Sequence, residues 1–262
     1  MNKIHLSIFI IFFFIISSCK KEKPPLKAES CFLTQSNHQI GYDYYFPADK
    51  TFESDDQGRV IKMISKYAPL KESSATFTYS NSQIIETFTN TGGSKFTKIY
   101  KLDNQGRIVE SNNYSGEFQL YYSYNKDGYL SKINYFVRNQ LAYSRELVYT
   151  GGNLTKVIET EKNGIVLPDG NITIEYNDMG FKENFFIAYE YIPPGDDVSP
   201  VVLKYMGKSS KNLVSKIIAS PKNINIYTYE LDKKGNIIKL YHLNPGSANT
   251  YTPSSFSYNC KN

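Results

Sequence analysis

The amino-acid sequence predicts an all-β fold, a large antiparallel β-meander of repeated hairpins that is curled or barrel-like and water-soluble. Three observations predict it. One turn motif recurs along the chain, its copies lie about 24 residues apart where the count is cleanest, and residues of high strand propensity fill the segments between them. The 262 residues include 23 Tyr and 16 Phe, and no segment after residue 30 has a convincing helical period.

The recurring motif has Asp or Asn at its first position and Gly at its fourth. The Asx side chain caps the turn and the glycine accepts a positive φ, so the motif predicts a type I turn that closes a hairpin through a glycine bulge. Degenerate copies near Ser82, Gly152 and Lys211 extend the series to about eight hairpins, or about sixteen strands. The five clear copies occupy residues 55–58, 103–106, 125–128, 177–180 and 232–235.

The strands that follow these turns have apolar residues two and five positions after the glycine, as at Leu130 and Ile133 or at Leu154 and Val157. An odd spacing places the two residues on opposite faces of a regular strand. Either both faces are partly covered, or a bulge shifts the alternation.

Charged residues interrupt the same segments at Lys62, Lys132, Lys156, Glu183 and Lys239. A transmembrane barrel needs an uninterrupted apolar band on its lipid-facing side. The sequence therefore predicts a barrel-like fold that faces water.

The N-terminus has the order of a bacterial lipoprotein signal. Lys3 is followed by an apolar run over residues 8–16 and then by Ser17-Ser18-Cys19. The run is shorter than the roughly 20 residues of a membrane-spanning helix. We expect residues 1–18 to be removed and Cys19 to carry the lipids; an uncleaved anchor, or a plain secretory signal with a chance cysteine, are the alternatives.

Residues 19–30 form the predicted lipidated tether, because they are charged and contain proline, and residues 31–262 form a single repeat-built β domain. With Cys19 committed to lipid, Cys31 and Cys260 remain at the two ends of that domain in a compartment where disulfides form. We expect these two to pair; two free buried thiols are the alternative. A bond would bring the first and last strands together.

Composition argues against several function classes. Without Lys3 the chain has 29 basic against 25 acidic residues, a net charge of +4, and the basic residues are dispersed, which gives nucleic-acid binding little support. No metal-binding or nucleophile motif is present, and only His38 and His242 remain after the signal. We therefore expect no catalytic residues, no metal and no cofactor. The turn aspartates are interpreted as turn caps, with calcium binding as the alternative.

Tyrosine clusters are the candidate binding surfaces. Aromatic rings on a sheet can stack on sugars or contact another protein, although cross-strand pairing alone also explains them. Absence of Trp weakens the sugar interpretation. The candidate ligand-binding residues are Tyr42, Tyr44, Tyr121, Tyr122, Tyr189 and Tyr191.

Two of the turns carry a family resemblance. Tyr100-x-x-Asp-x-x-Gly-Arg-Ile108 and Tyr229-x-x-Asp-x-x-Gly-Asn-Ile237 are similar to the YD repeats of large wrapping β proteins. With the signal, the start at Cys31 and the ending Phe256-Ser-Tyr-Asn-Cys260, nearly all of the chain more closely resembles uncharacterised lipoproteins of Bacteroidetes-type bacteria that have a β-meander, porin-like domain. The resemblance implies a fold but no assigned activity or site residue.

The sequence as a whole predicts a lipid-anchored protein of the cell envelope without enzymatic activity that binds a protein partner. Binding of a polysaccharide or small ligand is the alternative. Lys20 directly after Cys19 resembles the sorting signal for passage to the outer membrane, which leaves either the periplasmic face or the cell surface as the location.

Overall fold

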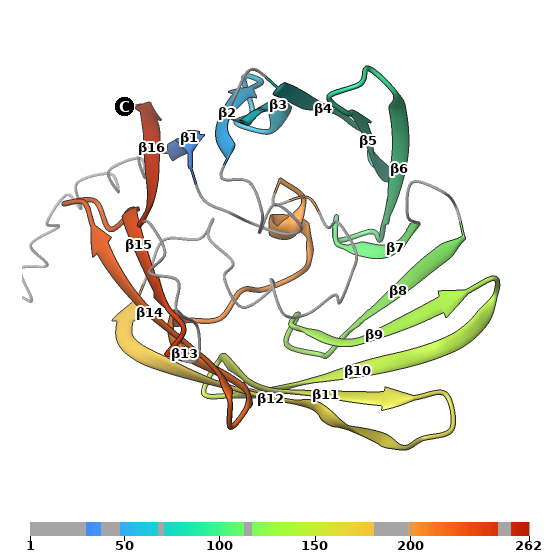
Figure 1. Ribbon diagram of the computed structural model, residues 1–262. Helices are drawn as coiled ribbons and strands as arrows, with labels where there is room; N and C mark the ends of the chain where they lie inside the picture. The colour runs from blue at the N-terminus through green and yellow to red at the C-terminus, as the bar shows by residue number, and fades with distance from the viewer. Residues whose placement is uncertain are drawn as a thin grey trace, which may run out of the picture.

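The computed structural model describes residues 30–37, 48–67, 71–112, 117–180, 199, 201–245 and 253–261. Sixteen antiparallel strands in this part of the chain follow one another around a ring and close into one barrel, which Figure 1 shows. The predicted all-β meander is confirmed, and the sheet is a closed barrel rather than an open, curled one.

The strands are, in chain order, β1 Ser30–Ser36, β2 Ala48–Ser54, β3 Val60–Tyr67, β4 Lys71–Tyr79, β5 Gln83–Thr89, β6 Lys95–Leu102, β7 Ile108–Asn112, β8 Phe118–Tyr124, β9 Leu130–Val137, β10 Gln140–Thr150, β11 Asn153–Glu161, β12 Val166–Gly180, β13 Asn212–Ser220, β14 Asn223–Leu231, β15 Ile237–Leu243 and β16 Ser254–Lys261. A short 3₁₀ helix, η3, spans Leu203–Tyr205. Among the described residues no helix is long and apolar enough to cross a membrane.

Four of the five predicted turns have the expected geometry. In the first, the Gln57 and Arg59 amides donate to Asp55 Oδ1 at 3.0 and 2.9 Å, and Gly58 adopts φ +74°. The Arg59 guanidinium also bonds Asp55 Oδ2 at 2.7 Å, so the carboxylate is used within its own turn, as a cap. Glycines 106, 128 and 235 have positive φ in the same way. Because these hairpins all turn at one end of the barrel, we call it the Asx-turn end.

The fifth copy, Asn177 to Gly180, does not close a hairpin. The Met179 amide donates to Asn177 Oδ1 at 3.0 Å, so the capping bond forms. However, Gly180 is not among the positive-φ glycines, and it pairs with Asn212 as the last residue of β12. The local signal is present, and the described strand that pairs with this part of β12 is β13, which begins at Asn212.

Bulges explain the odd apolar spacing, so of the two explanations the shifted alternation is confirmed. Ser123 pairs with Lys132 and Tyr124 with Leu130, which leaves Ser131 as the extra residue between them. Leu130 and Ile133 are consequently both buried, at 0% and 3% exposure. The same irregularity after the turn recurs between β10 and β11, where Leu154 and Val157 both enter the core.

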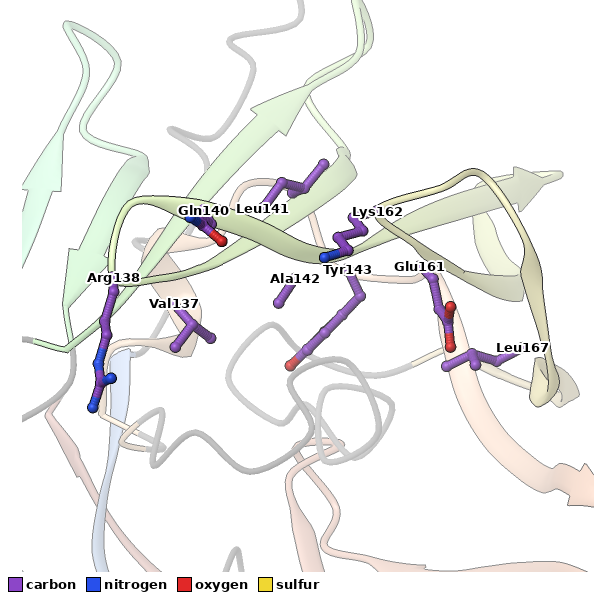
Figure 2. Close-up of a pocket in the computed structure, with 9 residues that line it drawn as sticks. All are labelled: Val137, Arg138, Gln140, Leu141, Ala142, Tyr143, Glu161, Lys162 and Leu167. Carbon is purple, nitrogen blue, oxygen red and sulfur yellow. The ribbon is translucent and has the colours of Figure 1, made fainter.

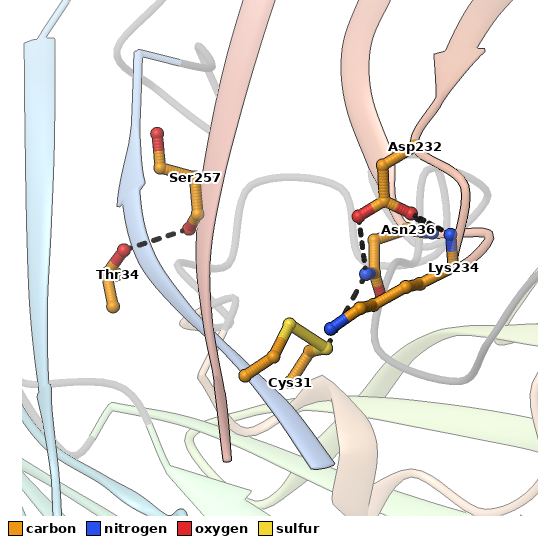
Figure 3. The surroundings of a disulfide bond; sticks show 7 residues. Cys31, Thr34, Asp232, Lys234, Asn236 and Ser257 are labelled. Carbon is orange, nitrogen blue, oxygen red and sulfur yellow. Dashed lines mark hydrogen bonds between the residues drawn. A yellow bond between two sulfur atoms is a disulfide. The ribbon is translucent and has the colours of Figure 1, made fainter. Parts of the chain in front are cut away.

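A disulfide fastens the seam where the first and last strands meet. Cys31 on β1 lies opposite Cys260 on β16, and their sulfurs are bonded across a sequence separation of 229 residues, as predicted. Figure 3 shows the surroundings: Asn236 Nδ2 lies 3.6 Å from Cys31 Sγ, and Thr34 Oγ1 donates to the Ser257 carbonyl at 3.1 Å.

The outer face carries cross-strand ion pairs. Lys216 Nζ lies 3.5 Å from Glu175, and the shorter pairs Lys62–Glu53, Lys101–Glu110 and Lys239–Glu230 span 3.1, 2.8 and 3.0 Å. Such exposed pairs stabilise the fold little in water, but each outward Lys would cost about 2–4 kcal/mol at a bilayer midplane. Ten of the described strands have eight residues or fewer, below the roughly 9–11 residues of a membrane-spanning strand, whereas β10 and β12, with 11 and 15 residues, reach that length. The outer wall of the barrel therefore carries charged side chains on several of its strands.

Candidate functional site

The barrel lumen is filled at the Asx-turn end by the segment 201–207, and Figure 1 shows η3 inside the ring of strands. Val202, Leu203 and Met206 are at most 6% exposed and belong to the same apolar cluster as the strand residues Leu130 and Leu154. A sixteen-stranded barrel of the porin kind leaves an aqueous channel. Here apolar side chains occupy that space, so we call 201–207 the plug.

The last residue of the plug and the chain that follows it are bonded to neighbouring hairpins at the same end. Gly207 forms a bridge with Tyr129, and the Lys208 amide donates to the Gly128 carbonyl at 2.9 Å. Further along, Ser210 Oγ accepts from the Leu154 amide at 3.1 Å and lies 2.9 Å from the Tyr176 hydroxyl. Burial raises the pKa of that hydroxyl to about 12, so it stays protonated. The plug is thus held by backbone bonds as well as by packing.

Substitution of Gly207 by Ala should loosen this attachment. Gly207 has φ +83°, and an added Cβ would lie 2.6 Å from the Gly128 carbonyl oxygen. Strain and overpacking together should cost about 2–4 kcal/mol of unfolding free energy. Gly164→Ala is the matched control, because Gly164 has the same φ of +83° but no atom within 4 Å of the added Cβ. Urea unfolding of both variants measures the difference, and equal losses would mean that the close approach is unimportant.

The middle of the lumen is polar. On β10 and β11, Arg145 and Glu159 face each other with 8% and 14% exposed side chains, and Glu159 Oε2 lies 2.6 Å from Arg145 Nε and 2.5 Å from Nη2. On two other strands of the barrel, β5 and β6, Glu86 lies opposite Lys98, and its carboxylate accepts a hydrogen bond from the Tyr100 hydroxyl at 2.8 Å. Buried charges of this kind require partners.

A pocket of about 690 Å³ opens at the end opposite the plug, and we call it the mouth pocket. Figure 2 shows its residues on the β9–β10 hairpin and on the β11–β12 connection, with the side chains of Val137, Tyr143 and Glu161 on the same side of the strands. Its volume is within the range of small-molecule sites. The lining residues are Val137, Arg138, Gln140, Leu141, Ala142, Tyr143, Glu161, Lys162 and Leu167.

An aromatic ladder leads to this pocket across three neighbouring strands. The Phe118 and Tyr135 rings are stacked with centroids 5.5 Å apart, and the Tyr135 and Tyr143 rings with centroids 4.5 Å apart and an interplanar angle of 15°. Tyr143 is both the last ring of the ladder and part of the pocket lining. Cross-strand pairing holds these rings rigidly, because each is packed against the next.

The structure separates Tyr121 from Tyr122, although the sequence groups them. Tyr121 faces outward, is 37% exposed, and meets Phe136 edge-on at 5.3 Å. Tyr122 faces the lumen at 4% exposure, with its hydroxyl 2.9 Å from Ser111 Oγ. The two therefore do not form one binding surface, because successive strand residues point to opposite faces. Cys19, Tyr42, Tyr44, Tyr189 and Tyr191 lie outside the described residues.

The histidine that the structure describes has a packing role. The His242 ring stacks on Tyr227 at 4.9 Å with an interplanar angle of 8°, and its Nε2 lies 2.7 Å from Asn225 Oδ1. His38 lies outside the described residues. Within the described ranges, no three His, Cys, Asp or Glu side chains are grouped as a metal ion would need.

No sequence pattern points directly to the mouth pocket. Its tyrosines, Tyr135 and Tyr143, were hidden among the other strand aromatics, and their alignment depends on the register of three strands. One available signal was the Val137-Arg138-Asn139-Gln140 segment, since a two-residue hairpin with Arg at its first turn position is unusual.

Comparison with known proteins finds solved structures with a similar fold. No protein-family model matches the chain, and no curated protein matches it. A porin-like protein from Bacteroides uniformis has a similar crystal structure, with a TM-score of 0.61 and 17% identity over 90% of this chain and 99% of that one. A porin-like protein from Bacteroides vulgatus gives a TM-score of 0.56 and 16% identity over 87% and 99%. At these identities the likeness shows a shared barrel fold.

Proposed function

We propose that this protein is a lipid-anchored protein of the cell envelope that acts as a non-catalytic binding module, with a protein as its partner. The observation that carries the proposal is the plug inside a barrel whose outer wall bears ion pairs. A barrel that is filled at one end and charged outside is poorly suited to conducting solutes across a bilayer. It is well suited to presenting a rigid surface.

Anchoring and location rest on the sequence. The Ser17-Ser18-Cys19 end of the signal supports lipid attachment at Cys19, and Lys20 supports passage to the outer membrane. The resemblance to lipoproteins with a porin-like domain has the same implication. The disulfide between Cys31 and Cys260 also favours an oxidising compartment outside the cytoplasm.

Two measurements on the full chain test these points. In cells fed an alkyne-bearing fatty acid, the wild type should incorporate the label and Cys19→Ala should not. Purified lipidated protein in planar bilayers should give no stepwise conductance, with a general porin as the positive control. Label in the Cys19→Ala variant would refute the attachment site, and discrete conductance steps would refute the binding-module assignment.

The partner is tested by mild crosslinking of intact cells followed by mass spectrometry. We expect one recurrent envelope protein to crosslink to the anchored form. An otherwise identical chain exported with a plain cleavable signal should lose this product, because the tether no longer concentrates it at the membrane. A preparation without a recurrent partner would contradict the protein-partner proposal.

A second candidate function, binding of a saccharide or small ligand, is favoured by the mouth pocket. The pocket combines a packed aromatic ring, Tyr143, with amide, carboxylate and cationic groups at Gln140, Glu161 and Arg138. Ligand sites commonly combine an apolar lining with a few convergent polar groups.

A further inference from the structure

The turn at the lip of the mouth pocket is conformationally strained. Arg138 and Asn139 have φ values of +49° and +64°, and in the described part of the chain they are the only residues other than glycine with positive φ. Positive φ at both central positions is the requirement of a type I′ hairpin turn, for which Asn-Gly and Gly-Gly are the favoured pairs. The corresponding turn between β10 and β11 has Gly151 and Gly152, with φ +60° and +86°.

Arg138 is therefore a costly residue for the backbone at this position, since its Cβ disfavours the left-handed region. Strained residues of this kind cluster where function needs them. Little side-chain contact accounts for it here: the Arg138 side chain is 80% exposed, and its Nη2 reaches Glu117 only at 3.5 Å. The Arg138 amide also donates to the Glu117 carbonyl at 3.0 Å, but any residue other than proline could make that bond. What the turn does accomplish is to place a guanidinium at the lip of the pocket.

The groups around this lip have complementary chemistry. Tyr143 is held flat by stacking on Tyr135 at 4.5 Å, so its ring is an ordered platform. Around it are the exposed Gln140, Glu161 and Lys162 together with Arg138. Amide, carboxylate and guanidinium groups are planar and offer paired donors or acceptors.

A pyranose ring matches this set of groups. Its axial C–H groups form an apolar face that packs on an aromatic ring, whereas its hydroxyls point outward at the edge and need paired donors and acceptors. The lining contains both signs of charge, two cations and one carboxylate, so neutral hydroxyls and an acidic substituent can each find partners. A purely apolar ligand would make no use of these polar groups.

We propose that the mouth pocket is a carbohydrate-binding site in which a pyranose unit of a saccharide chain packs against Tyr143, with its polar edge toward Arg138 and Glu161. This inference deepens the second candidate function and rests on it. It is independent of lipid attachment and of the protein partner, which are measured in cells by labelling and crosslinking.

Isothermal titration of the full-length protein in detergent provides the test, with two probes of equal length: a hexamer of glucose and a hexamer of galacturonic acid. We expect at least one to bind. Binding of the glucose hexamer would identify the hydroxyls as the recognised groups, and binding of the acidic hexamer alone would identify the carboxylates. Absence of heat with both probes at millimolar concentration would overturn the carbohydrate assignment.

Variants then locate the site. Arg138→Asn combined with Asn139→Gly supplies the favoured turn pair, so it should raise the thermal unfolding midpoint by about 2–4 °C. It should also weaken saccharide binding about tenfold, the effect of losing one charge-assisted hydrogen bond. Tyr143→Leu should weaken binding as well. Lys222→Asn is the control, because Lys222 is an exposed cation in the β13–β14 turn and does not line the pocket.

If the turn variant unfolds at a higher temperature and binds saccharide more weakly, Arg138 serves binding and not the fold. Replacing a residue that stabilises the fold would lower the unfolding midpoint instead. Unchanged affinity in both the turn variant and Tyr143→Leu would place the saccharide elsewhere and refute the site. Equal weakening by Lys222→Asn would show only a general effect of charge on the barrel end.

Discussion

Removal of the Cys31–Cys260 disulfide is expected to lower the unfolding free energy by about 3–5 kcal/mol. In the chain-entropy model a closed loop of this length contributes about 5 kcal/mol, and strain or residual structure in the unfolded chain reduces that figure. The bond also holds β1 in place. In the described pairing β1 is aligned with β16 at six positions but with β2 only at Gln35 and Ser36.

The measurement compares guanidinium unfolding of the wild type with that of the Cys31→Ser/Cys260→Ser double variant. A reducing agent should shift the wild-type midpoint toward that of the variant and leave the variant unchanged. Hydrogen exchange of the amides of β1 should rise most, because this strand closes the barrel and has few bonds on its other side. Coincident midpoints with and without reductant would show that the strand pairing alone closes the barrel.

The strand order and the disulfide were predictable because both depend on local or strongly constrained signals. Asp55 and Gly58 encode their turn within four residues, and the same holds for Asp103 and Gly106. The bulge after the turn also leaves a signal in the sequence, because it makes the spacing between the buried residues Leu130 and Ile133 odd. Cys31 and Cys260 had no other partner once Cys19 was assigned to lipid.

The plug and the mouth pocket were not predictable, since they depend on contacts between distant residues. Asn177 to Gly180 carries the same turn signal as the true hairpins, and the sequence does not say that the chain then runs through residues 201–207 inside the lumen. Likewise, the stacking of Phe118, Tyr135 and Tyr143 needs the register of β8, β9 and β10. Local propensity identifies each strand but not which rings meet.

Neutralising Glu159 is the second change for which we expect a large effect. The carboxylate accepts both guanidinium bonds of Arg145, whose side chain is 8% exposed, so Glu159→Gln leaves a cation inside the lumen without its counter-charge. Burial lowers the pKa of Arg145 below its ordinary value, and the attraction of Glu159 offsets only part of that effect. Loss of one partner of a buried pair typically costs about 3–5 kcal/mol.

Two further variants separate the cost of an unpaired charge from the value of the pair. Glu110→Gln breaks the pair Lys101–Glu110, which has a similar distance of 2.8 Å but a lysine side chain 58% exposed, and should cost less than about 1 kcal/mol. Arg145→Leu combined with Glu159→Leu removes both charges and should recover most of the stability lost in Glu159→Gln, as judged by the urea midpoint. If the double variant is no more stable than Glu159→Gln, then the pair stabilises the lumen through its bonds, and the loss does not come from the buried cation.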